Sequence, residues 1–239
     1  MRAVFPPACL ACGEVTEDAH ALCGACWREA GFLAGSLVCD LCGAPLPGRD
    51  EGVAAHCDDC LRVGRPWERG RAAMPYRGTG RVLALALKHG DRTDLARPLG
   101  GWMARAARPL LKDLAGEAAL VPVPLHWTRL FGRRFNQTAL LARHAGRALG
   151  VEVLPDALVR AKRTASLGHK GARERHEALA DAISPHPWRG RALRGRTAIL
   201  VDDVLTSGAT LAATAEAALE AGAAGVRVLV LARASRGDG

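Results

Sequence analysis

Residues 197–211 read Thr-Ala-Ile-Leu-Val-Asp-Asp-Val-Leu-Thr-Ser-Gly-Ala-Thr-Leu. The apolar run 198–201 ends in two adjacent carboxylates, Asp202 and Asp203, and small or hydroxylated residues follow at 206–210. An alanine-rich segment with helical spacing then begins. This order predicts a buried parallel strand, a pair of acids at its carboxyl end, a turn that can bind an anion, and the N-terminus of a helix.

The residue types in this stretch favour a ribose phosphate as the ligand. An ionised aspartate accepts hydrogen bonds from two hydroxyls, which suits the vicinal diol of a ribose. Unpaired backbone N–H groups at a helix start, together with hydroxyl side chains and a glycine, suit a phosphate. The alternative is an acidic N-cap before an ordinary amphipathic helix. That alternative explains an isolated Asp-Asp but not the strand, acids, turn and helix in this order.

This segment closely resembles the motif with which type I phosphoribosyltransferases bind phosphoribosyl pyrophosphate (PRPP). The resemblance implies that Asp202 and Asp203 contact the ribose hydroxyls. It also implies that the 5′ phosphate is bound by a loop that consists of Thr206, Ser207, Gly208, Ala209 and Thr210. Purine-salvage members have an aspartate at the position of Thr206. Its absence argues against purine salvage and leaves the acceptor and the catalytic residues unidentified.

Length and charge limit the function of the whole chain. Its 239 residues suffice for one medium domain and a small one, and no apolar run approaches the length of a membrane span. We therefore expect a cytoplasmic protein without membrane insertion. Residues 1–70 carry 6 basic and 10 acidic side chains, whereas the remainder carries 27 and 14. The basic remainder requires an anionic partner, either PRPP and pyrophosphate or nucleic acid.

The cysteines are confined to the first part of the chain. Disulfides are disfavoured in the cytoplasm, and the spacing Cys-x-x-Cys lets two thiolates of one tight turn reach the same ion. The pattern therefore predicts two structural Zn2+ sites with four thiolates each. Short linkers favour sequential pairing, in which the first two pairs share one ion, and interleaved pairing is left open. The pairs are Cys9/Cys12, Cys23/Cys26, Cys39/Cys42 and Cys57/Cys60.

The distribution of cysteines and apolar runs predicts two domains. A linker rich in glycine, proline and arginine begins at residue 64, so we expect a zinc module over residues 1–65 and a second domain over residues 66–239. In the second domain short apolar runs alternate with helical segments, which predicts an open, mostly parallel α/β sheet. We expect strands at 71–76, 118–122, 197–201 and 226–232, helices at 80–88, 95–114, 136–149 and 209–221, and a polar loop at 163–177.

The order of motifs along the chain resembles the ComF family of zinc-ribbon phosphoribosyltransferase-like proteins, which are linked to DNA uptake in competent bacteria. The resemblance rests on the cysteine pairs, a Val-Pro-Val-Pro strand at 121–124, a Phe-Asn-Gln helix start at 135–137 and the PRPP loop. It covers essentially the whole chain and implies a type I phosphoribosyltransferase fold that binds PRPP with Mg2+. It also implies contacts to the diphosphate from Lys88, Arg129 and Arg133, although Lys88 equally fits a helix C-terminal cap.

Two departures from the family pattern keep two functions open. Arg134 replaces the glycine that usually precedes Phe-Asn-Gln, and the loop at 163–177 lacks the family's Gln and Asn. The first function is a transferase that binds PRPP with Mg2+ and releases pyrophosphate. The second is a non-catalytic accessory protein that binds nucleotide or single-stranded DNA, or the DNA-uptake machinery, on the same fold. The aromatic content of 4% is low for a surface on which bases stack.

Overall fold

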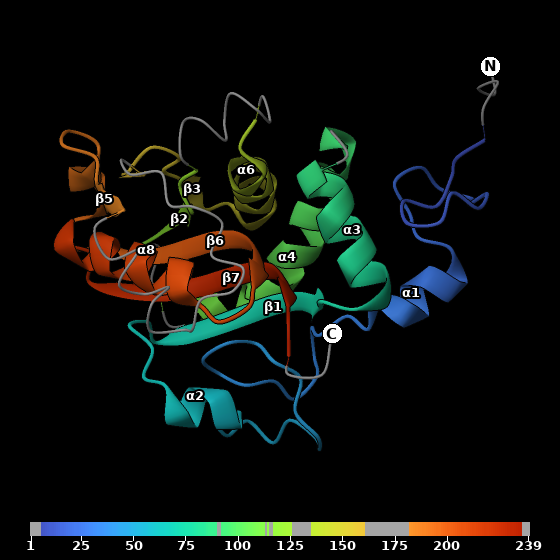
Figure 1. The fold of residues 1–239 in the computed structure, drawn as a ribbon, viewed down its shortest axis with the longest axis horizontal. Helices are drawn as coiled ribbons and strands as arrows, with labels where there is room; N and C mark the ends of the chain where they lie inside the picture. Colours follow the sequence, from blue (N-terminus) through green and yellow to red (C-terminus); the bar gives the residue numbers. More distant parts are fainter. Residues whose placement is uncertain are drawn as a thin grey trace.

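A five-stranded parallel sheet lies at the centre of the molecule (Figure 1). The computed structural model describes residues 6–89, 92–112, 114, 117–125, 135–160 and 182–235. The strands lie in the order β1 (Arg69–Pro75), β7 (Gly225–Arg233), β6 (Thr197–Leu205), β2 (Ala118–Pro122) and β3 (Glu152–Val153). The inner strands are nearly continuous apolar runs because both faces of the sheet are covered.

Helices cover the two faces unequally. Three helices pack on one face, and their buried side chains share one apolar cluster with Ile199 and Val201 of β6. These helices are α3 (Gly78–His89), α4 (Ala96–Leu111) and α6 (Gln137–Leu149). Helix α8 (Ala209–Glu220) packs on the opposite face against Ala198 and Leu200, the alternate residues of the same strand. This alternation follows from the two-residue period of a strand, and it confirms the expected α/β class.

The helix boundaries follow local signals in the sequence. Helix α6 begins after Asn136, whose side chain accepts hydrogen bonds from the N–H groups of Thr138 and Ala139, and it ends at Gly150 with φ 69°. Pro98 does not interrupt α4, because it lies in the first turn, where its missing N–H group has no intrahelical acceptor.

A small hairpin and two 3-10 turns lie outside the main sheet. Strands β4 (Leu158–Arg160) and β5 (Ile183–Pro185) pair antiparallel and pack against α8. The 3-10 turns are η1 (Thr93–Leu95) and η2 (Gly190–Leu193). None of the helices in the described part of the chain has the length and apolar character that a membrane span requires.

The cysteine-rich segment forms two small ribbons, each with an isolated antiparallel bridge and a short helix. The bridges join Ala8 to Val15 and Val38 to Pro45. The helices α1 (Gly24–Ala30) and α2 (Asp58–Arg62) begin directly after Cys23 and Cys57. Figure 1 shows α1 beside α3. It also shows the second ribbon, which contains α2, along the edge strand β1.

The second ribbon packs closely on β1. The N–H group of Gly70 donates to the carbonyl of Asp40 at 2.7 Å, and Arg71 Nη2 donates to Asp40 Oδ1 at 2.6 Å. A Cβ atom on Gly70 would lie 2.3 Å from the carbonyl oxygen of Leu41, so this contact requires glycine. The ribbon therefore covers an edge strand whose N–H and C=O groups would otherwise be exposed.

Candidate functional site

The chain reverses its direction across the sheet between β6 and β2. From β6 it passes through α8 to β7 on one side, and from β2 through α6 to β3 on the other. The two helices therefore lie on opposite faces and leave a crevice at the carboxyl ends of β6 and β2, where open α/β sheets bind their ligands. Residues 202–210 emerge from β6 at this crevice.

Asp203 is the more firmly held of the two carboxylates. Its side chain is buried, and its Oδ1 accepts from the N–H group of Val204 at 2.8 Å. Its Oδ2 accepts from Gln137 Nε2 at 3.2 Å and lies 3.9 Å from Lys88 Nζ. The structure thus brings Lys88, from the end of α3, to the acidic pair.

Gln137 is a site residue for which the sequence predicted no role. It is the first residue of α6, and only 3% of it is exposed. Thr138 Oγ1 donates to the carbonyl of Val123 at 2.9 Å and thereby ties the start of α6 to the segment that follows β2. The Phe-Asn-Gln motif indicated a helix start, but only the tertiary fold shows that this helix points Gln137 at Asp203.

Asp202 lies beside Asp203 and is partly buried. Its Oδ1 accepts from the N–H group of Asp203 at 2.8 Å. Removal from water and the neighbouring charge of Asp203 raise the pKa of Asp202 well above its usual value, and Lys88 opposes this shift only in part. Ionisation of Asp202 beside Asp203 is therefore unfavourable in the free protein, and hydroxyl groups of a ligand would favour the ionised form by donating hydrogen bonds to it.

Replacing Asp202 by asparagine is expected to stabilise the ligand-free protein at neutral pH. The folded-state pKa of Asp202 lies above its unfolded value of about 3.9. The contribution of Asp202 to the free energy of unfolding is therefore fully present only when the pH is below the unfolded pKa. This contribution is lost as the pH rises through the folded-state pKa. Asparagine does not titrate, so the variant does not lose stability in this way. Thermal unfolding should give a higher midpoint for the variant at about pH 8, and the difference should shrink toward about pH 4. A lower midpoint at the higher pH would contradict this assignment.

The residues after the acids form the expected turn at the start of α8. Gly208 adopts φ 85°, which favours glycine, and α8 begins at the next residue. The turn lines a small recess of about 40 Å³ together with Asp202. The first N–H groups of a helix lack intrahelical partners, so the recess presents donors to an anion. Its lining includes Thr206, Ser207, Gly208, Ala209 and Thr210.

The remaining phosphate candidates are not placed by the structure. Arg129 and Arg133 lie outside the described residues, as does the loop at 163–177. Their expected contacts to a diphosphate stay predictions.

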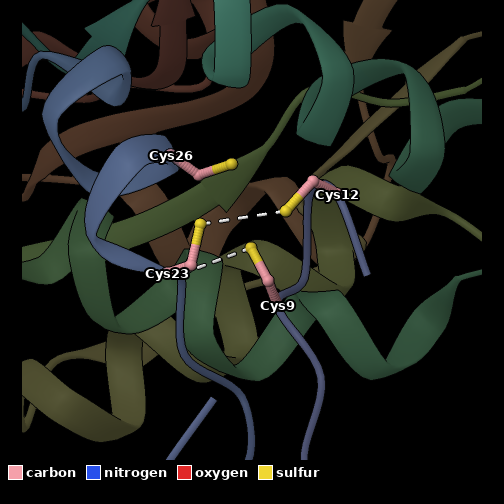
Figure 2. A group of neighbouring side chains, drawn as sticks. All are labelled: Cys9, Cys12, Cys23 and Cys26. Carbon is pink, nitrogen blue, oxygen red and sulfur yellow. Dashed lines mark hydrogen bonds between the residues drawn. The ribbon is translucent and has the colours of Figure 1, made fainter. Parts of the chain in front are cut away.

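The cysteines gather in two groups that follow their order in the chain. Figure 2 shows the first group, Cys9, Cys12, Cys23 and Cys26, with the four sulfur atoms directed toward one another. The second group consists of Cys39, Cys42, Cys57 and Cys60, and within each group the sulfur atoms lie within 4.8 Å of one another. The grouping is sequential, so the structure does not adopt the interleaved alternative.

Both groups fit a tetrahedral zinc ion. A Zn–S bond of about 2.3 Å implies sulfur atoms about 3.8 Å apart. The separation is 3.8 Å between Cys12 Sγ and Cys23 Sγ, and 3.6 Å between Cys42 Sγ and Cys57 Sγ. The groups differ in burial, because Cys12 is exposed whereas Cys39 and Cys42 are fully buried. The clusters support two structural zinc sites, one near the surface and one within the core.

Two domain families match separate parts of this chain. Residues 1–61 match the double zinc ribbon domain family, and residues 139–238 match the phosphoribosyl transferase domain family. In solved structures, the allosteric regulatory enzyme of purine biosynthesis is 18% identical, with a TM-score of 0.40. That alignment covers 62% of this chain and 30% of the solved chain, so the chain spans less than a third of that protein.

Curated relatives match over almost their whole length. Competence protein F from Haemophilus influenzae is 28% identical over 229 residues, which cover 95% of this chain and 96% of the relative. DNA utilization protein YhgH from Escherichia coli O157:H7 is 30% identical over 235 residues, which cover 95% of this chain and 97% of the relative. Because this similarity extends through both the double zinc ribbon and the phosphoribosyltransferase domain, the chain belongs to the ComF family.

Proposed function

We propose that this protein binds PRPP together with Mg2+ at the carboxyl end of β6. The observation that carries the proposal is the placement of the acidic pair and the N-terminus of α8 on one crevice of a phosphoribosyltransferase fold. Asp202 and Asp203 would accept hydrogen bonds from the 2′ and 3′ hydroxyls of the ribose. The loop 206–210 would surround the 5′ phosphate with N–H and hydroxyl donors.

The surrounding residues prepare the site for an anionic sugar. Gln137 and Lys88 fix the orientation of Asp203, so that its oxygens are directed before the ligand arrives. The positive end of α8 favours the phosphate. Mg2+ bound with PRPP would neutralise the diphosphate as a leaving group. Thr206 carries no charge and cannot act as a general base at neutral pH, so the proposal assigns PRPP binding and no particular acceptor.

The related proteins suggest the process that this site serves. They are named for competence and DNA utilization, and we propose that this chain acts in the same process, in the cytoplasm. We further propose that each cysteine group holds one Zn2+ as a structural ion and that the ribbon module ends near residue 65.

Calorimetric titration tests the proposed ligand. Wild-type protein loaded with zinc should bind PRPP saturably in the presence of Mg2+, and it should bind ribose 5-phosphate more weakly because the diphosphate is absent. A screen of candidate acceptors for pyrophosphate release then asks whether transfer occurs. Failure of PRPP to bind under these conditions would remove the proposal.

A second candidate function, the binding of single-stranded nucleic acid, is favoured by a basic groove. The groove has a volume of about 520 Å³ and lies between the second ribbon and α4. Arg105, Arg108 and Lys112 line it from α4, where their spacing places them on one side of the helix, and all three are exposed. Within the described residues none of them forms an ion pair, so their charges are available to phosphates.

An aromatic cluster stands at one end of this row of cations. Trp102 of α4 lies one helical turn before Arg105, and its ring centroid is 5.0 Å from that of Phe32 and 6.3 Å from that of Trp27. Trp27 is 45% exposed. An exposed ring beside a row of cations can stack a base while the cations contact the backbone.

Replacing Arg105, Arg108 and Lys112 together by alanine is expected to weaken binding of a single-stranded oligonucleotide. The slope of log affinity against log salt should fall by about 2, because each phosphate contact to a single strand contributes about 0.7. Fluorescence anisotropy over a range of salt concentrations measures both quantities. Replacement of Arg143 and Arg147 by alanine is the control, because it removes positive charge from α6 rather than from the groove. An unchanged slope in the triple variant would exclude this groove.

A further inference from the structure

Arg65, which follows the second ribbon in the chain, lies against the phosphate loop, defined here as residues 206–210. Its Nη1 donates to the carbonyl of Ser207 at 2.7 Å. A Cβ atom on Gly208 would lie 2.6 Å from the same nitrogen and 3.2 Å from Trp67 Cη2. The side chains of Arg65 and Trp67 therefore contact the backbone of the loop directly, which leaves no space for a side chain at position 208.

Trp67 holds the guanidinium of Arg65 in this position. Its side chain is buried, and its Nε1 donates to the carbonyl of Leu41 in the second ribbon at 2.6 Å. Arg65 Cζ lies 5.4 Å from the centroid of the Trp67 ring, which is within the range of a cation–π contact. The orientation of Arg65 is therefore fixed by the segment that joins the second ribbon to β1.

Arg233, at the end of β7, contacts the two peptide groups that precede the one held by Arg65. It is 3% exposed, and its Nη1 donates to the carbonyls of Leu205 and Thr206 at 3.2 Å each. The same nitrogen also donates to the carbonyl of Ala234. Together the two arginines contact three successive carbonyl groups of the chain, those of residues 205–207.

The geometry of the peptide unit converts these contacts into a direction for the next N–H groups. None of the described peptide bonds is cis, and in a planar trans peptide the C=O and N–H bonds point in opposite directions. The N–H groups of residues 206–208 therefore point away from the arginines, and none of them donates to an acceptor among the described residues. The recess is lined by the loop and by neither arginine, so the loop separates the arginines from the recess.

The positive charge of the two arginines acts in the same direction. Neither guanidinium forms an ion pair with a carboxylate of the described residues. Their charge therefore adds to that of the N-terminus of α8 and favours an anion in the recess.

We propose that Arg65 and Arg233 are positioning residues that direct the three N–H groups of residues 206–208 toward the 5′ phosphate. The identity of this ligand rests on the proposed function, and the assignment of Arg65 extends the site to the segment that follows the ribbons. Because the carbonyls are already held, the N–H donors need no reorientation when the phosphate binds.

The orientation of the loop is tested without a ligand, in full-length zinc-loaded protein. Arg65→Met removes the donor at a partly exposed position, and Arg62→Met is the control, because Arg62 is an exposed arginine of α2. Backbone 15N relaxation should show order parameters at residues 207 and 208 that fall from about 0.85 to below about 0.6 in Arg65→Met. They should stay unchanged in Arg62→Met. Unchanged order parameters in Arg65→Met would overturn the proposal.

The consequence for binding is measured with two ligands that differ in the 5′ phosphate. In the presence of Mg2+, Arg65→Met should bind ribose 5-phosphate about tenfold more weakly than wild type, because the donors are no longer oriented. Its affinity for inorganic pyrophosphate, which has no 5′ phosphate, should not change. An equal loss for both ligands, or the same loss of ribose 5-phosphate affinity in Arg62→Met, would show a general effect of structure or charge and overturn the proposal.

Failure of the proposed function gives a different result. If wild-type protein binds neither PRPP nor ribose 5-phosphate, the proposed function fails, whereas the order parameters of the ligand-free protein still decide whether Arg65 orients the loop.

Discussion

Replacing Asp202 and Asp203 together by alanine is expected to weaken binding of PRPP with Mg2+ by more than about a hundredfold. Each carboxylate would accept charge-assisted hydrogen bonds from ribose hydroxyls, and each such bond contributes about 1.5–3 kcal/mol. The double variant also leaves the Nε2 group of Gln137 and the ammonium of Lys88 without their acceptor. Isothermal titration calorimetry measures the affinity directly.

The chain contains a matched control for this experiment. Glu17 and Asp18 form a second adjacent acidic pair, and both are exposed in the first ribbon. Their replacement by alanine makes the same change in net charge at a distance from the crevice, so PRPP affinity should stay within about twofold of wild type. Similar losses of affinity in both double variants would show that net charge, rather than the placement of Asp202 and Asp203, controls binding.

Serine at Cys39 is expected to abolish cooperative folding, whereas serine at Cys12 should leave the sheet folded. Cys39 is fully buried and belongs to the apolar cluster that contains residues of β6, β7 and α8. A structural zinc site contributes apparent free energies of about 10–16 kcal/mol, which is comparable to the whole stability of a domain, about 5–15 kcal/mol. Cys12 is exposed in the peripheral ribbon, so its loss should remove one zinc ion and little of the core.

Elemental analysis and thermal unfolding together check this difference. Cys12→Ser should contain about one zinc ion per chain and retain a cooperative transition, while Cys39→Ser should lack that transition. Equal thermal midpoints for the two variants would contradict the structural distinction between the surface group and the core group. Zinc content near zero in wild-type protein would contradict the assignment of both groups as zinc sites.

Features encoded within short segments could be predicted from the sequence. The strand, acids, turn and helix of residues 197–211 follow one another directly, so their periodicity and residue types define them locally. The sequential grouping of the cysteines followed from the short linkers between pairs. The mostly parallel sheet followed from the alternation of apolar runs and helices.

Features that depend on distant contacts could not be predicted in this way. The contact of Gln137 with Asp203 requires the placement of α6 beside β6, and that of Arg65 with Ser207 joins residues 142 positions apart. The packing of the second ribbon on β1 gives no periodic signal, because it depends on close backbone approach at Gly70 and Gly43. The sequence did not predict the pairing of β4 with β5, because these strands are short and far apart in the sequence.

A crystal structure of the protein with PRPP and Mg2+ tests the central claim most directly. The predicted result is that the 5′ phosphate lies within the loop 206–210 and that the ribose hydroxyls contact Asp202 and Asp203. The side chain of Gln137 should keep its contact with Asp203 in the complex. Density for PRPP in the basic groove between the second ribbon and α4, with an empty crevice at β6, would contradict the account.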